Sequence, residues 1–140
     1  SGPGVFINSS GASVGYIEHH DFAKQETSTI DGISKPLKII GPGDQQVFFP
    51  VESGRLTNLS IKARYDDLYG TTNKPQIILN ENLEWGVSPQ TGTLTVGVNT
   101  WETISFNAFT PSGFGYGSLL LINSATGSSG IAYFSTLRIT

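Results

Sequence analysis

The side chains best suited to ligand chemistry lie in two loop segments. Tyr65–Gly70 offers two carboxylates and two phenols directly after a strand-like run. Asn80–Gly86 places an indole among amides and acids. A loop aromatic flanked by hydrogen-bonding groups suits a ligand or partner anchor, while a lid packed on a sheet edge is the structural alternative. We therefore predict a ligand- or partner-binding site formed by Trp85, Tyr69, Asp66, Asp67 and Glu84.

Metal binding has weaker support. Calcium takes six to eight oxygen ligands, and the adjacent acids Asp66 and Asp67 supply a minority of them. Neighbouring strand residues also point to opposite faces, so a solvated turn is favoured over a calcium site. The pair His19–His20 lies between Glu18 and Asp21 but lacks zinc-ligand spacing, and the chain has no cysteine. We expect no metal and no cofactor, and a polar loop at the histidines.

Catalysis rests on one motif. Gly11–Gly15 matches Gly-X-Ser-X-Gly around Ser13, with two histidines close behind. That motif works on a sharp turn from a strand into a helix, and its histidine follows the acid in the chain. No helix-period segment follows Ser13, and the acids cluster in turns, where no buried general acid for glycoside hydrolysis is expected. We predict a non-enzyme with no catalytic residue.

The composition limits the partners. The 140 residues suit one domain, and without cysteine its sheets must hold it together by packing alone. Charged residues make up 14% and the net charge is -3, which gives no domain-wide basic field for nucleic acid or an anionic membrane. No apolar run reaches the length of a membrane span, and no signal-peptide pattern is present at the amino end.

The elements that must position any site are strands. In Leu59–Tyr65 apolar and polar residues alternate, and in the last segment Ile131, Tyr133, Leu137 and Ile139 share one parity. Shorter strands are predicted over 37–40, 45–51, 76–80, 93–98, 103–109 and 118–123, with Gly- and Pro-rich turns between them. Residues 19–25 are the only weak helix candidate. We predict an all-β fold, an antiparallel β-sandwich of the jelly-roll type with about eight strands.

The amino-terminal part differs from the rest. Residues 1–35 carry few large apolar side chains among Gly, Ser and Thr. They predict either an edge strand with long loops, which is favoured, or an arm that reaches a neighbouring subunit. Residues 36–140 are expected to form the sandwich.

A family resemblance covers about 90 residues from Pro50 onward. Its motifs are the turn Pro50–Arg55 before the strand Leu59–Tyr65, the Trp-containing run Asn99–Phe106, and Phe109–Pro111 followed by Leu119–Ile122 and Tyr133–Ile139. Their order resembles the jelly-roll family of carbohydrate-binding modules and galactose-binding-like domains. The resemblance places Trp101 in the core as an anchor for its strand, in preference to a sugar-stacking platform.

Two departures from that family affect the function. Its members often carry acids in the closing strand, some of which hold a structural calcium, and here Ser135 and Thr136 occupy those places. The surplus of exposed aromatics expected on a sugar-binding face is also small. Similar degenerate jelly rolls occur in bacteriophage virion proteins, and the low charge and Gly/Ser/Thr richness fit that group better; this is an analogy of fold.

The leading hypothesis is therefore a non-enzymatic virion structural protein, a phage capsid decoration or fibre-tip domain at the virion surface. It would dock onto capsid or other virion proteins and form a homo-oligomer such as a trimer, with the amino-terminal arm as a clasp. The alternative is a carbohydrate-binding module of an extracellular enzyme or adhesin, which would bind a surface glycan through Trp85, Tyr69 and Asp66 or Asp67.

Overall fold

A computed structural model of the chain describes residues 3–7, 13–18, 23–25, 29–67, 69–70, 73–80, 86–112 and 116–140, with side chains from residue 29 onward except Pro50 and Tyr116. These residues form strands, turns and loops, with no helix among them. Accordingly, the described part of the chain contains no apolar helix of membrane-spanning length.

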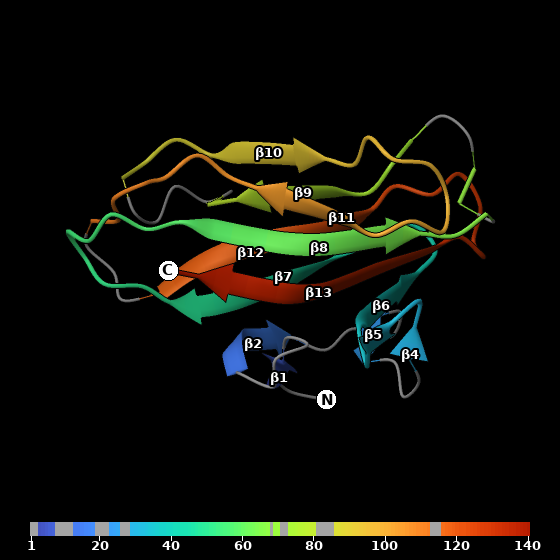
Figure 1. Ribbon diagram of the computed structural model, residues 1–140, viewed down its shortest axis with the longest axis horizontal. Helices are drawn as coiled ribbons and strands as arrows, with labels where there is room; N and C mark the ends of the chain where they lie inside the picture. Colours follow the sequence, from blue (N-terminus) through green and yellow to red (C-terminus); the bar gives the residue numbers. More distant parts are fainter. Residues whose placement is uncertain are drawn as a thin grey trace.

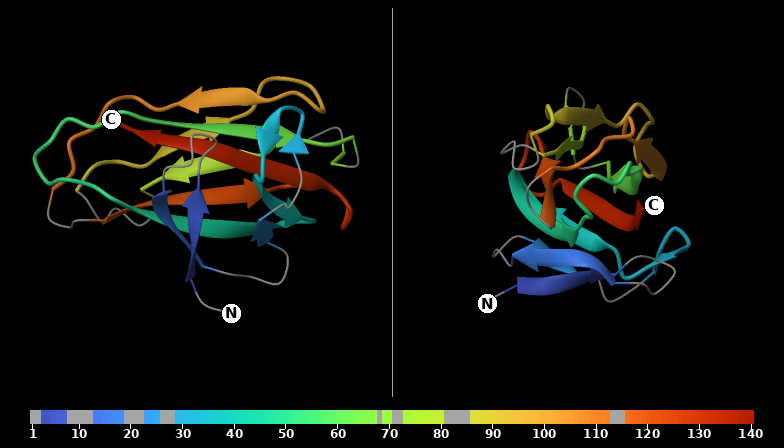
Figure 2. Two further views of the ribbon diagram at one scale, coloured as in Figure 1. Left: turned by 60° about the horizontal axis from the view of Figure 1, so that its bottom comes forward. Right: turned by 90° about the vertical axis from the view of Figure 1, so that its left-hand side faces the viewer.

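The strands form two packed sheets and one small hairpin (Figures 1 and 2). Sheet A contains, in spatial order, β1 (Pro3–Ile7), β2 (Ser13–Glu18), β7 (Gly43–Pro50), β12 (Tyr116–Asn123), β9 (Gln76–Leu79) and β10 (Gln90–Thr93). Sheet B contains β11 (Glu102–Ser105), β8 (Leu59–Tyr65), β13 (Ile131–Ile139), β6 (Leu37–Ile40) and β3 (Ala23–Gln25). The hairpin pairs β4 (Thr29–Ile30) with β5 (Ile33–Ser34).

The predicted fold class is confirmed, since the strands of both sheets pair antiparallel and the sheets pack as a sandwich. Eight strands, β6–β13, follow residue 36, and short strands also arise before it. Of these, β2 pairs with β7 at the edge of sheet A, and β3 pairs with β6 at the edge of sheet B. Part of the weak helix candidate is therefore a strand, and residues 19–22 lie outside the described residues.

The strand prediction over 93–98 is wrong. The strand is β10, which ends at Thr93, and the chain then leaves the ladder. The amides of Thr95 and Val96 donate instead to the carboxylate of Glu102, with N–O distances of 2.7 and 3.2 Å. The predicted strand 103–109 is shorter than expected, because β11 ends at Ser105 and Phe109 forms an isolated bridge with Thr57.

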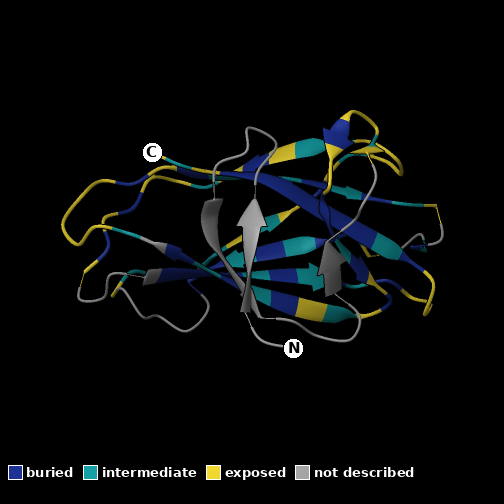
Figure 3. Ribbon diagram, turned by 90° about the horizontal axis from the view of Figure 1, so that it is seen from below, coloured by how far each residue is buried: buried dark blue, intermediate teal, exposed yellow. Residues whose placement is uncertain are grey.

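The core lies between the sheets and follows strand alternation. In β8 the side chains of Leu59, Ile61, Ala63 and Tyr65 are buried, while those between them are partly exposed. In sheet A the register places Leu119 of β12 between Val47 and Leu79, all buried in the core. Buried and partly exposed residues alternate along several strands (Figure 3). Because successive strand residues point to opposite faces, the partly exposed residues form an outer face on each sheet.

Two local features shape the core, a bulge within sheet B and a hydrogen-bonded link between the two sheets. A β-bulge in β13 falls between Ser135 and Arg138, with Thr136 at φ 52°, and lets both Phe134 and Leu137 reach the core. The buried Asn123 of β12 donates from Nδ2 to the carbonyl of Ile39 in β6 at 2.7 Å and to that of Gly130 at 3.0 Å. Its Oδ1 accepts the amide of Ala125 at 2.8 Å. Asn123 therefore links sheet A directly to sheet B.

Candidate functional site

The predicted carboxylate and phenol after β8 mainly support the fold. Asp66 is partly buried, and its Oδ1 accepts the amide of Ile131 at 3.0 Å. Tyr69 is fully buried, its ring stands edge-on to Tyr65 at 5.2 Å between centroids, and its hydroxyl oxygen accepts the amide of Ser124. Burial raises the pKa of Tyr69 to about 12. Both side chains thus hold the ends of the loop that joins β12 to β13.

The other predicted site residues divide between surface and undescribed chain. Asp67 is exposed in the turn after β8. Trp85 and Glu84 lie outside the described residues, so their part in a site stays a prediction. The polar loop predicted at His19 and His20 also lies outside the described residues. Ser13 opens strand β2. A nucleophile elbow needs its serine between a strand and a helix, so this position lacks the required context.

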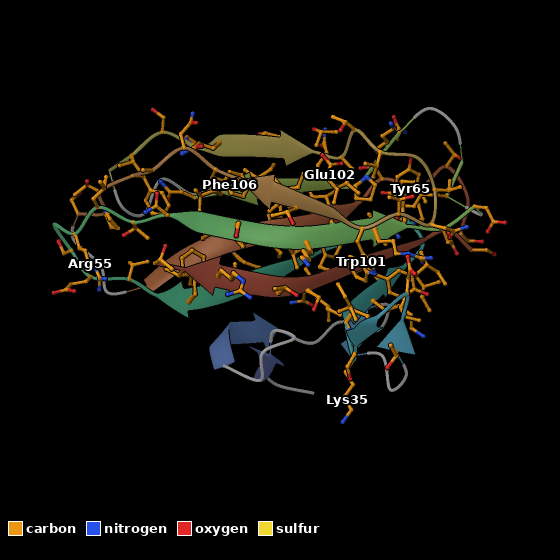
Figure 4. The ribbon with its side chains drawn as sticks, viewed as in Figure 1. Lys35, Arg55, Tyr65, Trp101, Glu102 and Phe106 are labelled. Carbon is orange, nitrogen blue, oxygen red and sulfur yellow. The ribbon has the colours of Figure 1, made fainter. Side chains whose placement is uncertain are left out.

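Trp101 anchors a hairpin to the outer face of sheet B. Its indole Nε1 donates to the carbonyl of Ile30 at 3.0 Å, and its ring is tilted against that of Tyr133 at 6.4 Å between centroids. Arg64 extends over the Tyr133 ring at 5.9 Å and makes an ion pair with Asp31 at 4.0 Å. Trp101 is partly exposed and lies at the end of the sandwich occupied by β4 and β5 (Figure 4). The prediction of a core position for Trp101 is wrong, because the residue is partly exposed and contacts the hairpin outside the core between the sheets.

Sequence reasoning missed the outer face of sheet A. Four large apolar side chains there are partly exposed, where a solvated face would ordinarily carry polar residues: Phe48, Ile78, Leu120 and Ile122. The register places Leu120 between Gln46 and Ile78, and Ile122 between Asp44 and Gln76. The unbroken apolar run Leu119–Ile122 was the available signal, because alternate residues of a strand face opposite sides.

A polar pocket adjoins this face at the start of β9. Its volume is about 420 Å³, and it is lined by Asn73, Lys74, Gln76, Thr93 and Ser124. Gln76 Nε2 lies 3.4 Å from Thr93 Oγ1, and Lys74 Nζ donates to the carbonyl of Thr95 at 3.0 Å. Amide, hydroxyl and ammonium groups beside an apolar surface can hold a ligand that has both hydroxyl groups and an apolar face.

The described residues give no metal centre. They contain no group of three or more His, Cys, Asp or Glu side chains placed to hold an ion. Ser135 and Thr136 are buried hydroxyls whose oxygens lie 3.4 Å apart.

The sequence matches no protein-family profile and no curated protein. Solved structures do resemble the fold. One described as "Family 16 Carbohydrate Binding Module-2" superposes with a TM-score of 0.58 at 13% identity, covering 85% of both chains. The carbohydrate-binding module CBM6cm-2 of Cellvibrio mixtus lichenase 5A, in complex with cellotriose, gives 0.53 at 18% identity over 98% of both chains.

A third similar structure is the enzymatically active domain of bacteriophage CBA120 tailspike protein 4. Its TM-score is 0.50 at 12% identity, and the match covers 99% of this chain but 18% of that chain. At these identities the likeness establishes the fold alone, a jelly-roll sandwich shared with carbohydrate-binding modules. The carbohydrate-binding alternative and the virion hypothesis both stay predictions at this point.

Proposed function

We propose that this domain is non-catalytic and binds a carbohydrate on the outer face of sheet A. The observation that carries the proposal is the set of partly exposed apolar side chains Phe48, Ile78, Leu120 and Ile122 beside the polar pocket at Gln76. A contiguous apolar patch on a solvated face is a feature of binding surfaces.

The two kinds of surface match the two kinds of group on a sugar. The aliphatic side chains of Ile78 and Leu120 suit the apolar C–H face of a sugar ring, and their neighbours Gln46 and Thr91 can bond its hydroxyls. The pocket adds the Gln76 amide, the Thr93 hydroxyl and the Lys74 ammonium. A few polar groups at the edge of an apolar floor are what fixes the orientation of a bound ligand.

The loop prediction is compatible with this face. Asn80 and Gly86 flank the segment that joins β9 to β10, and both strands belong to sheet A. In the sequence, Trp85 and Glu84 belong to that segment. We propose that they extend the sugar-binding face, in an extracellular module whose structural neighbours include one solved with cellotriose.

Docking on a virion surface is the second candidate. The likeness to a phage tailspike domain favours it, as do the exposed strand and loop positions occupied by Ser, Thr and Asn. In that case the partners would be capsid or other virion proteins, and the chain would form a homo-oligomer.

Affinity electrophoresis on a panel of neutral polysaccharides, followed by titration with the best oligosaccharide, tests the sugar-binding proposal. Gln76→Ala and Leu120→Ser should each weaken binding at least about tenfold, the effect of losing roughly 1.4 kcal/mol of contact free energy. Arg55→Gln, an exposed change in the loop before β8 and away from this face, is the control and should bind like the parent.

The site fails if Gln76→Ala and Leu120→Ser bind as tightly as the parent. If Trp85→Ala alone abolishes binding, the sugar lies on the loop at residues 81–85 and not on the sheet. If no glycan binds and the protein sediments as a stable oligomer, the virion candidate is favoured.

A further inference from the structure

The outer face of sheet B gathers basic residues in a chain whose net charge is -3. Strand alternation and register assign this face the cationic side chains of Lys38, Lys62, Arg64 and Arg138. The described acids are engaged or located elsewhere. Asp44 lies on the outer face of sheet A, Asp67 lies in the turn after β8, Glu52 pairs with Arg55, Asp66 and Glu102 accept backbone amides, and Asp31 pairs with Arg64.

The hairpin divides this face into a covered and an open half. The covered half lies at the β4–β5 hairpin, where Trp101 contacts Ile30 and Tyr133, and Arg64 pairs with Asp31. Farther along the sheet, the open half carries Ser60, Lys62, Thr103, Ser105 and Arg138, all partly or fully exposed. Within the described part of the chain, neither Lys62 nor Arg138 forms an ion pair.

The register brings these cations and hydroxyls together. Ser60 lies opposite Ser105 on one side and Arg138 on the other, and Lys62 lies opposite Thr103. Lys62 and Arg138 are diagonal neighbours, a relationship that places Cα atoms on the order of 7–8 Å apart. A pocket of about 280 Å³ opens here, lined by Asn58, Leu59, Ser60, Ser105, Phe106, Arg138 and Thr140. Figure 4 shows Phe106 well away from Trp101, toward the other end of the sandwich.

We propose that this open half of sheet B is a second binding surface, which takes the carboxylate or sulfate groups of an acidic polysaccharide. Arg138 offers planar paired donors for such an anion, Lys62 offers a point charge beside it, and Ser60 and Ser105 offer hydroxyls. The choice of a polysaccharide as the carrier of the charge rests on the proposed function. The site itself is distinct, because it lies on the opposite sheet.

The observations favour an acidic glycan over a nucleic acid. Phosphate-backbone binding gains its affinity from cations spread over many phosphates. Among the described residues, this patch offers only Lys62 and Arg138 without an ion pair. The described patch also lacks an open ring for base stacking, since Phe106 packs against the core beside Gly92. Hydroxyls next to the cations suit the hydroxyl-rich surroundings of a charged sugar.

Calorimetric titration with oligogalacturonate, its methyl ester and a sulfated oligosaccharide tests the surface and separates the two anion sources. Arg138→Gln and Lys62→Gln should each weaken binding of an acidic ligand about tenfold or more, the loss expected for a charge-assisted hydrogen bond. Arg55→Gln removes an exposed cation in the loop before β8 and is the matched control. Binding by the parent should weaken as NaCl is raised, and the methyl ester should not bind at this site.

The inference is overturned if the methyl ester binds as well as the free acid, or if Arg55→Gln costs as much as Arg138→Gln. A single-stranded oligonucleotide that binds more tightly than both acidic glycans would also overturn it. Gln76→Ala separates the two proposals, because it should weaken neutral glycans and leave the acidic ligand bound. If neutral glycans fail to bind while Arg138→Gln still loses the acidic one, the sheet A proposal alone is wrong.

Discussion

Trp101 and Ile30, 71 positions apart in the chain, are joined by a hydrogen bond from the indole Nε1 to the Ile30 carbonyl at 3.0 Å. The bond ties the β4–β5 hairpin to the turn before β11. It therefore closes one half of the outer face of sheet B and leaves the other half open.

Trp101→Phe should release the hairpin while keeping an aromatic ring on the sheet. The Ile30 carbonyl loses its donor, so we expect a fall in the free energy of unfolding of about 1–2 kcal/mol. Hydrogen exchange should accelerate at residues 29–34, and denaturant unfolding gives the magnitude. Val98→Ala changes an exposed side chain in the same turn and is the control. Equal acceleration in both variants would contradict the anchoring role.

Tyr69→Phe should lower the free energy of unfolding and change how that free energy depends on pH in the alkaline range. The variant leaves the Ser124 amide without its acceptor, at a cost of about 1–3 kcal/mol at neutral pH. Burial raises the pKa of Tyr69 from 10.0 to about 12, so the neutral phenol's contribution is complete below pH 10.0 and is lost as pH rises through about 12. Urea titrations across this range should therefore show a smaller pH dependence in Tyr69→Phe. If the free energy of unfolding depends on pH equally in the parent and in Tyr69→Phe, the Tyr69 phenol does not cause the alkaline loss of stability.

Glu102→Gln should remove a contribution to the free energy of unfolding that depends on pH in the acid range. Burial alone would raise the pKa of Glu102, but the Thr95 and Val96 amides, the Thr95 hydroxyl and the charge of Lys74 together lower it below its usual 4.5. The carboxylate's contribution is thus present above pH 4.5 and is lost as pH falls through the lower folded-state pKa. We expect the variant to lose about 1 kcal/mol at pH 7 and to unfold with a flatter acid profile. Glu52→Gln, in an exposed pair with Arg55, should show neither effect.

Gly92→Ala should be costly for a steric reason. A Cβ atom there would overlap the Cγ2 methyl of Ile104, a buried side chain of the facing strand, and would touch the Phe106 ring. Overpacking of this kind costs about 1–3 kcal/mol. Gly97→Ala provides the comparison because a Cβ at Gly97 meets no atom within 4 Å. Thermal unfolding should separate the two variants, and similar midpoints would show that Ile104 moves aside freely.

The predictability of each strand depended on whether its pattern was regular. In β8, Leu59–Tyr65 alternates without interruption, and both its bounds and its buried side are as predicted. In β13 the predicted parity grouped Tyr133 with Leu137, but Phe134 is the residue that faces the core with Leu137. The cause is the bulge at Thr136, because one extra residue inverts the alternation and carries no clear mark in the sequence.

The candidate surfaces were harder to predict because they depend on strand pairing. Leu120 and Ile122 resemble core residues until the register places them beside Gln46 and Asp44 on an outer face. Lys62 and Arg138 are likewise remote in the chain and become neighbours only through β8 and β13. The loop acids and tyrosine were visible in the sequence, but their hydrogen bonds to Ile131 and Ser124 were not.

The bonds of Asn123 to Ile39 and Gly130 have a mechanical consequence. Apolar contacts between two sheets resist separation, but they oppose sliding weakly because such contacts are non-directional. A buried amide bonded across the gap adds a directional restraint against shear. Under the proposed function, a bound polysaccharide would exert force along an outer face of the sandwich. Asn123 is placed to resist sliding of one sheet over the other under that force.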